Sequence, residues 1–586
     1  MKTGSLIFLL TACFISDLMT AQDLSYSRPG NMFYREMPNP AKTNTEEWSK
    51  ISKPVNVSFA SDNERYAKEK VPFSSEKTTW YGTAWRGEKV HAQILVWTKK
   101  DIPSLGFQVE DLVHENGDRI LRSNIKVAFV RYVMSDEFKD GCDHQNKRYD
   151  SSLVSDPIDI IDKIPVATNT VQPIWLSIQV PGNSKPGKYT GSLLISTAEN
   201  RVLRIALNVL DHQLPPPSQW EFDLDFWQYP DPIAKMHDVK LWSEEHFELM
   251  RSYYTALAKA GQKVITANMI EQPWGLTHVH FSDPTLIQWI KKKDGSWVHD
   301  FDLFDRYISF VMSCGITRRI NCYTMITWDL SYIYYDEALG KNVSITLQPG
   351  SLAYSDFWSP MLKKFTAHLK EKNWFSMTAI AMDERPIESV RAIMTLLKKI
   401  DQRWKIALCT DHHYPELENE IYDYSIASYL KFDPAVLKER KAQGKPSTFY
   451  TACVENHPGP YTFSPAAENV WLGWHAAAKG YTGYLFWAFN TWVKNPLVDA
   501  RWRRYPSGTL FQYYPGPRSS IRFEKITEGI QDFEKIRILR AQFIKEGKGQ
   551  NLQELDDALS AFEIGKLDSI PARDTVAKAK AILNHY

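Results

Sequence analysis

The stretch Thr378–Pro386, TAIAMDERP, decides how the chain folds and where its chemistry lies. It opens with an apolar, strand-like run, and two adjacent carboxylates, Asp383 and Glu384, follow directly. Pro386 then begins an amphipathic helical pattern, because proline fits the first turn of a helix. This order predicts a strand, a loop and a helix of a (β/α)8 barrel, in which catalytic side chains lie at the carboxyl ends of the strands.

Two acids at the end of a barrel strand favour glycoside chemistry, because glycosidic bonds are cut by paired carboxyl groups. An Asp-Glu dipeptide is also common by chance, and the chain contains two more, at 136–137 and 336–337. Both of these lie in loop-like sequence, and only the pair at 383–384 stands between a strand of buried type and a helix. The local pattern alone leaves a catalytic and a structural role equally open.

The sequence around this stretch alternates between strand-like and helical patterns. Because eight strands with intervening helices are typical of a barrel, we expect a (β/α)8 barrel rather than a doubly wound sheet. The strands are expected at 221–227, 264–269, 319–326, 377–382, 405–410, 424–429, 448–454 and 483–490. The helices are expected at 244–260, 386–403, 434–443 and 465–479, and a further helix at 523–543 would close the barrel.

The first part of the chain has a different pattern. Short alternating strands separated by Pro-Gly turns predict a β-sandwich, with strands at 90–97, 125–133, 173–180, 189–197 and 202–210. A proline run at 215–217 separates it from the barrel. The expected organisation is a signal peptide at 1–21, a β-sandwich at 23–215, the barrel at 218–545 and a helical tail at 546–586.

The N-terminus is typical of an exported protein. Lys2 precedes an apolar run that is too short to span a bilayer, and the small residues before Gln22 suit cleavage near Ala21. Leu10–Cys13 also resembles a lipoprotein box, which would place a lipid on Cys13, but the apolar run before it is short. We therefore expect a periplasmic or cell-surface protein, and we favour simple cleavage over lipidation.

Composition excludes some classes of function. Lys and Arg number 70 against 69 Asp and Glu, so there is no basic excess of the kind that binds nucleic acid. No later segment is apolar enough to span a membrane. The cysteines are far apart, which indicates neither a zinc site nor a disulfide framework, and no cofactor is expected. The oligomeric state stays open.

The strand ends of the expected barrel carry aromatic and polar residues. Trp227 ends the first strand and Trp328 follows the third. Flat apolar walls with hydrogen-bonding edges suit a polar, ring-shaped substrate. Asp411 and the adjacent histidines after the fifth strand lack a further ligand set, so we expect no metal there. The residues that we expect to bind substrate are Trp274, His413, Tyr414, Tyr429, Glu455, Trp487, Asn490 and Trp492.

Longer motifs give a family resemblance. The Asp383-Glu384 strand, GYLFWAFNTW at 483–492 and the segment from PSGTLFQYYPG at 506–516 to SSIRFEKITEGIQDFEKI at 519–536 together resemble glycoside hydrolase family 123. The resemblance covers most of the chain. It implies a retaining exo-β-N-acetylgalactosaminidase that acts on terminal β-GalNAc, including that of glycosphingolipids.

The resemblance also implies a substrate-assisted mechanism, in which the sugar's 2-acetamido oxygen attacks its own anomeric carbon. The family's adjacent acids map onto Asp383, which would orient the acetamido N–H, and Glu384, which would act as general acid and then base. We expect a tyrosine hydroxyl, that of Tyr429, near the amide oxygen. Two alternatives stay open, namely a β-N-acetylglucosaminidase and a non-catalytic glycan-binding surface protein.

Overall fold

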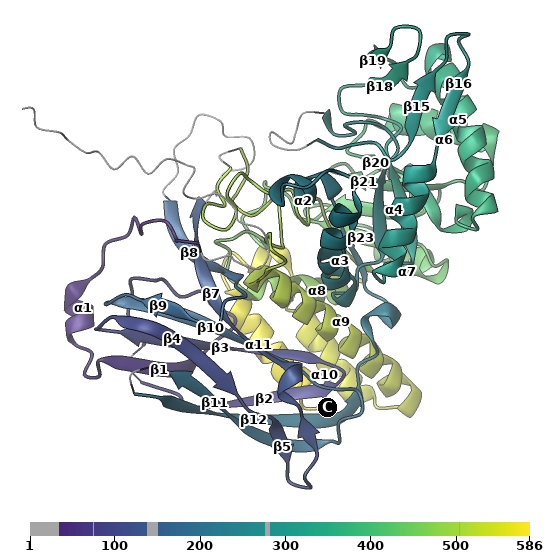
Figure 1. The fold of residues 1–586 in the computed structure, drawn as a ribbon. Helices are drawn as coiled ribbons and strands as arrows, with labels where there is room; N and C mark the ends of the chain where they lie inside the picture. Colours follow the sequence, from purple (N-terminus) through teal and green to yellow (C-terminus); the bar gives the residue numbers. More distant parts are fainter. Residues whose placement is uncertain (1–33, 74, 137–150, 198, 276–281, 503) are drawn as a thin grey trace, which may run out of the picture.

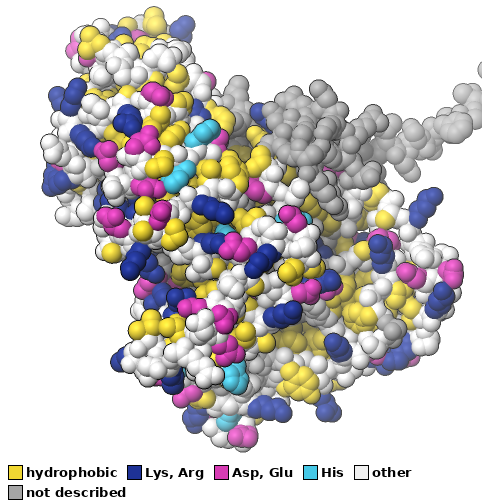
Figure 2. All heavy atoms as spheres, turned by 180° about the vertical axis from the view of Figure 1, so that it is seen from behind, with side chains coloured by type: hydrophobic (Ala, Val, Ile, Leu, Met, Phe, Trp, Pro, Cys, Tyr) yellow, Lys and Arg dark blue, Asp and Glu magenta, His cyan; other side chains and the backbone are white. Residues whose placement is uncertain are grey.

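The computed structural model describes residues 34–73, 75–136, 151–197, 199–275, 282–502 and 504–586. A β-rich N-terminal part lies beside an α/β part, and the C-terminal helices lie against both (Figure 1). The predicted fold class is confirmed. The signal peptide expected at 1–21, with Cys13, lies outside the described residues, as does Cys142. Figure 2 shows side chains of both charge signs interspersed over one face, in keeping with the near-zero net charge.

Eight parallel strands form the barrel, and each predicted barrel strand is present. Their order around the sheet is β13-β24-β23-β22-β21-β20-β17-β14. Between β13 and β14 a single bridge pairs Leu224 with Gln262, so the barrel is nearly closed. The Gln262 side chain bonds both the N–H and the C=O of Phe226 across this gap. The strands are β13 (Asp223–Phe226), β14 (Val264–Asn268), β17 (Arg319–Tyr323), β20 (Thr378–Asp383), β21 (Lys405–Thr410), β22 (Asp423–Ala427), β23 (Ser447–Tyr450) and β24 (Gly483–Phe486).

Helices cover the outside of the barrel. One of them, α6, begins at Ile387 directly after Pro386 and buries Val390, Ile393 and Leu397 against the sheet, as an amphipathic helix does. The helices of this part are α2 (Pro230–Met236), α3 (Glu244–Lys259), α4 (Asp302–Ser313), α5 (Leu352–Glu371), α6 (Ile387–Ile400), α7 (Pro434–Ala442) and α8 (Ala467–Lys479). A small sheet that was not predicted is built from two insertions, with β15 (Gln288–Lys291) and β16 (Trp297–Asp300) after β14 and β18 (Ser331–Asp336) and β19 (Lys341–Thr346) after β17.

The N-terminal part contains two β-sheets packed around a core of aliphatic side chains, among them Ile94, Ile174 and Leu207. After the short helix α1 (Thr45–Ser49), the first sheet comprises β1 (Val55–Ala60), β3 (Lys89–Thr98), β10 (Thr170–Gln179), β7 (Ile125–Asp136), β8 (Ser151–Ile158) and β25 (Ser519–Ser520). The second comprises β2 (Thr79–Arg86), β12 (Arg201–Gln213), β11 (Gly187–Ser196), β4 (Ile102–Val109) and β9 (Ile164–Val166), flanked by β5 (Leu112–His114) and β6 (Arg119–Ile120). Since β25 comes from beyond the barrel, the chain returns to the sandwich before its last helices.

Those last helices are α9 (Ile521–Glu546), α10 (Gly549–Leu559) and α11 (Ala572–Leu583). The first part of α9 is buried on all sides, although its sequence is rich in charge. Several of these charges meet a partner from another part of the chain: Arg522 binds Asp156 at 2.9 Å and Lys535 binds Glu88 at 2.8 Å. Just before the helix, Arg518 binds Asp159 at 2.6 Å. Buried charges are tolerated only when they are paired in this way.

The axes of α8 and α9 approach so closely that glycine is required at the contact. A Cβ atom on Gly473 of α8 would lie 2.1 Å from the carbonyl oxygen of Gly529 on α9, and one on Gly529 would lie 2.5 Å from the carbonyl oxygen of Val470. Real Cβ atoms do not approach backbone oxygens at these distances. The contact therefore fixes the spacing of the helix that seals the barrel.

We expect Gly473→Ala to lower the free energy of unfolding by about 2 kcal/mol, because the added methyl group forces the two helix backbones apart. Urea unfolding followed by circular dichroism measures the loss. Gly565→Ala is the matched control, since its new Cβ would meet nothing within 4 Å. Equal stability of the two variants would contradict this account of the contact.

Candidate active site

A pocket lies at the carboxyl ends of the barrel strands, where a (β/α)8 barrel carries its catalytic groups. Its walls come from β13, β20, β21, β23 and β24 and from the segments that follow β14, β17 and β24. It is lined by Trp227, Trp274, Trp328, Asp383, Glu384, Cys409, Tyr450, Thr451, Ala452, Cys453, Leu485, Trp487, Tyr505 and Thr509.

The two adjacent carboxyl groups both line this pocket, which a regular strand would not allow, because successive side chains of a strand point to opposite faces. Glu384 has a φ of 48°, in the left-handed region that non-glycine residues seldom adopt. Its N–H still donates to the carbonyl oxygen of Cys409 at 2.8 Å, so the turn is held against β21. Backbone strain of this kind is concentrated at functional sites.

The environment of Asp383 opposes its ionisation while Glu384 carries a charge. Burial and the neighbouring Glu384 raise the pKa of Asp383 to about 8. The charge of Arg385 and hydrogen bonds from the side chains of Trp328 and Trp274 act in the opposite direction and lower that pKa. Arg385 is held in place because its Nε donates to the Asp383 carbonyl oxygen at 2.8 Å and its guanidinium lies 4.8 Å from the centre of the Trp328 ring.

The surroundings of Glu384 also shift its pKa. Burial raises its pKa, and the negative charge of Asp411 adds to that effect. The hydroxyl of Tyr450, at the end of β23, donates to Glu384 Oε1 at 2.7 Å and lowers the pKa. Since that bond occupies Oε1, the other oxygen, Oε2, is left for a proton that can be passed to a bound molecule.

Burial and the charge of a neighbouring carboxylate both oppose ionisation, so we infer that the pair keeps one proton after the first is lost. Apparent pKa values then belong to the pair rather than to either residue. One group can donate a proton while the other carries the negative charge, which is the arrangement that general acid catalysis requires.

Aromatic side chains form the walls of the pocket. Trp227 and Trp274 are stacked with ring centres 5.1 Å apart, and Tyr323 lies 4.8 Å from Trp227. The same cluster contains the small barrel residues Ala379, Ala381 and Ala407. The aromatic walls therefore pack against small side chains of the barrel interior.

The residues predicted to bind substrate lie at different distances from this pocket. Trp274 and Trp487 line it. Tyr429 is 51% exposed, its hydroxyl donates to the Asp411 carbonyl oxygen at 3.4 Å, and it lies close enough for the charge of Glu384 to raise its pKa. Tyr414 donates to the Arg385 carbonyl oxygen at 3.4 Å. Glu455 accepts from the Ala452 N–H at 2.9 Å and from Ser428, so it braces the loop after β23.

Three further predicted residues have structural partners instead. Trp492 is buried and donates to the Tyr513 carbonyl oxygen at 2.7 Å. The Asn490 amide bonds both the N–H and the C=O of Tyr229. His413 pairs with Glu418 at 2.6 Å and packs on Phe432. They hold the segments that frame the pocket, and none of them is among the pocket-lining residues of the described chain.

Trp227 and Trp328, which the sequence placed at strand ends but not among the expected substrate-binding residues, both line the pocket. Several other lining residues were not predicted. Tyr450 ends β23, but the predicted strand ran on to residue 454, which hid its terminal position. Tyr505 and Thr509 come from a long segment after β24 with no regular pattern. Cys453 is disulfide-bonded, which the cysteine spacing did not indicate.

The described residues contain no group of three or more His, Cys, Asp or Glu side chains arranged to hold a metal ion. Within the same ranges, no helix is long and apolar enough to cross a bilayer.

Comparison with known proteins identifies the family of the chain. Residues 227–539 match the catalytic domain of glycoside hydrolase 123, and residues 59–197 match the glycoside hydrolase 123 N-terminal domain. No curated protein sequence matches the chain.

Among solved structures, a family 123 glycoside hydrolase from Clostridium perfringens, described in a study of glycolipid glycan hydrolysis, is 25% identical with a TM-score of 0.82. The alignment covers 91% of this chain and 98% of that chain. A family 39 glycoside hydrolase from Bacteroides cellulosilyticus WH2 is 10% identical over 73% of this chain and 80% of that chain, with a TM-score of 0.33. The family match spans more than half of the sequence and includes the strand with the two carboxyl groups, and the chain therefore belongs to glycoside hydrolase family 123.

Proposed function

We propose that the chain is a retaining exo-β-N-acetylgalactosaminidase that removes terminal β-GalNAc from glycans or glycosphingolipids. The observation that carries the proposal is that Asp383 and Glu384, adjacent in sequence, line one pocket. The raised pKa of each group supports a pair that keeps one proton. An enzyme whose own carboxylate is the nucleophile places two carboxyl groups on opposite sides of the bond. Neighbouring residues on one loop suit a reaction whose nucleophile belongs to the substrate.

In the first step, the 2-acetamido oxygen attacks the anomeric carbon and the bond to the leaving oxygen breaks. Glu384 gives its proton to that oxygen, so the leaving group departs as an alcohol and an oxazolinium ion stays in the pocket. Asp383 accepts a hydrogen bond from the acetamido N–H. Its negative charge offsets the positive charge that grows on the oxazolinium ring. The attack is intramolecular, so no entropy is lost in bringing a nucleophile to the sugar.

In the second step, water attacks the anomeric carbon and the oxazolinium ring opens to restore the acetamido group. Glu384, now a carboxylate, takes the proton from water. Two inversions at one carbon return the β configuration. Proton transfer by a positioned side chain contributes about 10²–10⁴-fold to the rate of such a reaction.

The Clostridium perfringens relative, studied for glycolipid glycan hydrolysis, supports a glycolipid substrate for this chain. The stacked indoles of Trp227 and Trp274, with Trp487, give the pocket flat faces on which the C–H groups of a sugar ring can pack. GalNAc and GlcNAc differ only at carbon four. Rates on aryl β-GalNAc and aryl β-GlcNAc therefore test the sugar preference, and faster cleavage of the GlcNAc glycoside would overturn the assignment to GalNAc.

Export is proposed on the leader-like N-terminus. The disulfide bond at Cys453 supports it, because disulfide bonds persist in oxidising compartments outside the cytosol.

Replacing the two acids separates their roles. Glu384→Gln removes the proton donor, so we expect cleavage of glycosides with poor leaving groups to be abolished and cleavage of aryl glycosides with activated leaving groups to persist in part. Asp383→Asn removes the charge that steers the acetamido group, so both substrates should be lost. Steady-state kinetics of both variants on both substrates measure this, and an equal mild loss in all four combinations would contradict the assigned roles.

The rate should depend on pH through the shared proton. With the pKa of Asp383 raised to about 8, the wild-type pair keeps its proton below that pH and loses it above, so kcat/KM should fall as pH rises past about 8. In Glu384→Gln the neighbouring charge is gone and Asp383 must ionise alone. The residual activity of this variant on an activated glycoside should then rise with pH, with a midpoint below pH 8. A pH-independent residual activity would count against a carboxylate role for Asp383.

Tyr450→Phe tests the hydrogen bond to Glu384. The tyrosine hydroxyl lowers the pKa of Glu384, so its loss should raise that pKa and move the alkaline limb of the pH profile to higher pH. We expect kcat on poor leaving groups to fall by about tenfold, equivalent to about 1.4 kcal/mol for one lost hydrogen bond to a charged group. An unchanged pH profile with a reduced rate would show that the hydroxyl serves only to pack the pocket.

A further inference from the structure

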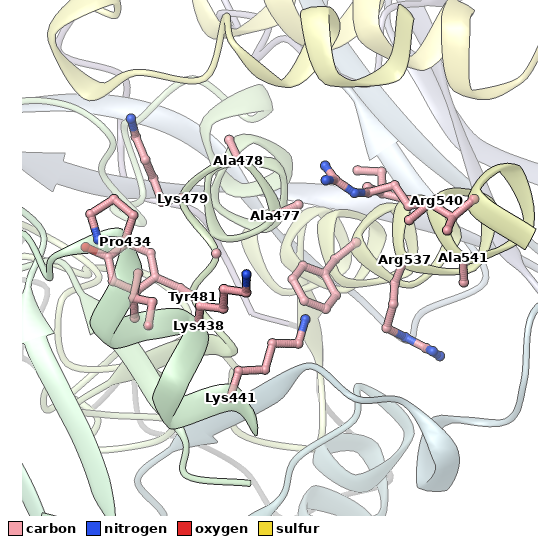
Figure 3. Close-up of a pocket in the computed structure, with 15 residues that line it drawn as sticks. Pro434, Lys438, Lys441, Ala477, Ala478, Lys479, Tyr481, Arg537, Arg540 and Ala541 are labelled. Carbon is pink, nitrogen blue, oxygen red and sulfur yellow. The ribbon is translucent and has the colours of Figure 1, made fainter. Parts of the chain in front are cut away.

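A second hollow lies outside the barrel, where α7, the end of α8 and the second half of α9 meet (Figure 3). α7 and α8 lead directly into β23 and β24, so this hollow lies near the amino ends of those strands, whereas the catalytic pocket lies at their carboxyl ends. The two pockets share no lining residue.

The floor of the hollow is apolar. Leu437, Tyr481 and Ile536 form part of it and are almost fully buried. Small side chains, at Ala477 and Ala478, stand where larger ones would fill the space. The apolar surface reaches the outside at one end, where Ile544 is 66% exposed.

Cationic side chains surround this floor, and Figure 3 shows Lys438, Lys441 and Arg540 around the hollow. Three cations of the rim already have an anionic partner: Lys479 pairs with Glu563, Arg537 with Glu534 and Arg540 with Asp556. Lys438 and Lys441 are exposed and form no ion pair with any residue in the described ranges. The hollow thus offers two uncompensated ammonium groups beside an apolar floor.

We propose that this hollow binds a small amphiphilic anion, that is, a carboxylate, sulfate or phosphate group on a slender apolar body such as a single acyl chain. The charged head would pair with Lys438 and Lys441, and the chain would lie on the floor beside Ala477 and Ala478. The floor is recessed between three helices, so a slender chain reaches it and the flat face of a bilayer or a folded protein does not.

This assignment rests on the outer hollow alone and is independent of the reaction in the barrel. Two trends follow from it. Each methylene added to the chain should raise the affinity about threefold to fourfold while the hollow has room. Added salt should weaken binding, because the exposed lysines are screened at high ionic strength.

The test is calorimetric titration of the full chain with sodium octanoate, sodium decanoate and neutral 1-octanol. We expect decanoate to bind about tenfold more tightly than octanoate, and octanol to bind more weakly than octanoate. The double variant Lys438→Glu and Lys441→Glu should weaken octanoate binding by roughly tenfold or more, since it turns attraction into repulsion. The matched control, Lys363→Glu with Lys399→Glu, makes the same charge change on exposed lysines of α5 and α6 and should bind as the parent does.

Other results would overturn the proposal. They are no binding of octanoate at millimolar concentration, equal binding of octanol, or an equal loss of affinity in the control variant. Vesicles of phosphatidylglycerol form a separate arm, and capture of vesicles without binding of free octanoate would assign the lysines to a membrane surface instead. Unfolding temperatures without ligand show whether each variant is folded, and hydrolysis rates should be the same in all of them.

Discussion

The pairing of buried charges along α9 is the constraint on which the architecture depends. Arg518 and Arg522 are fully buried and meet carboxylates of the β-sandwich, while Lys535 reaches Glu88. Removing one partner of such a pair leaves an uncompensated charge in the interior, which is strongly destabilising. The start of α9 and the residues just before it are therefore tied to the sandwich by buried ion pairs.

Packing of this kind allows the catalytic pocket to hold a strained backbone and buried carboxyl groups. Glu384 adopts a left-handed backbone conformation, and two adjacent carboxyl groups are buried side by side. Each of these features lowers stability, and the surrounding packing must compensate for it. In the proposed mechanism this pair holds one proton, with Tyr450 hydrogen-bonded to one oxygen of Glu384 and the side chains of Trp274 and Trp328 lining the same pocket. The chemistry that we propose uses this shared proton directly.

The sequence predicted the strands of the barrel better than it predicted the residues that line the pocket. Strands such as β20 and β21 were predicted correctly because an apolar run followed by polar residues is a local pattern that is typical of a barrel strand. Trp492 and Asn490 bind neighbouring loops instead of lining the pocket. Strand periodicity ends where a loop begins, so the direction of such side chains does not follow from the sequence. Tyr505 comes from a segment without periodicity, so only the folded chain brings it to the carboxyl pair. The long motif after β24 identified the family, yet it builds the buried α9 more than the catalytic site.

The central proposal is that the attacking group belongs to the sugar. Its most direct test is the rate of hydrolysis of aryl β-GalNAc glycosides whose acetamido methyl group carries increasing numbers of fluorine atoms. Fluorine withdraws electrons from the amide oxygen, so kcat/KM should fall steadily along the series, and the analogue with a hydroxyl at carbon two should not be cleaved. A rate that does not change with fluorination, together with efficient cleavage of the hydroxyl analogue, would contradict the account.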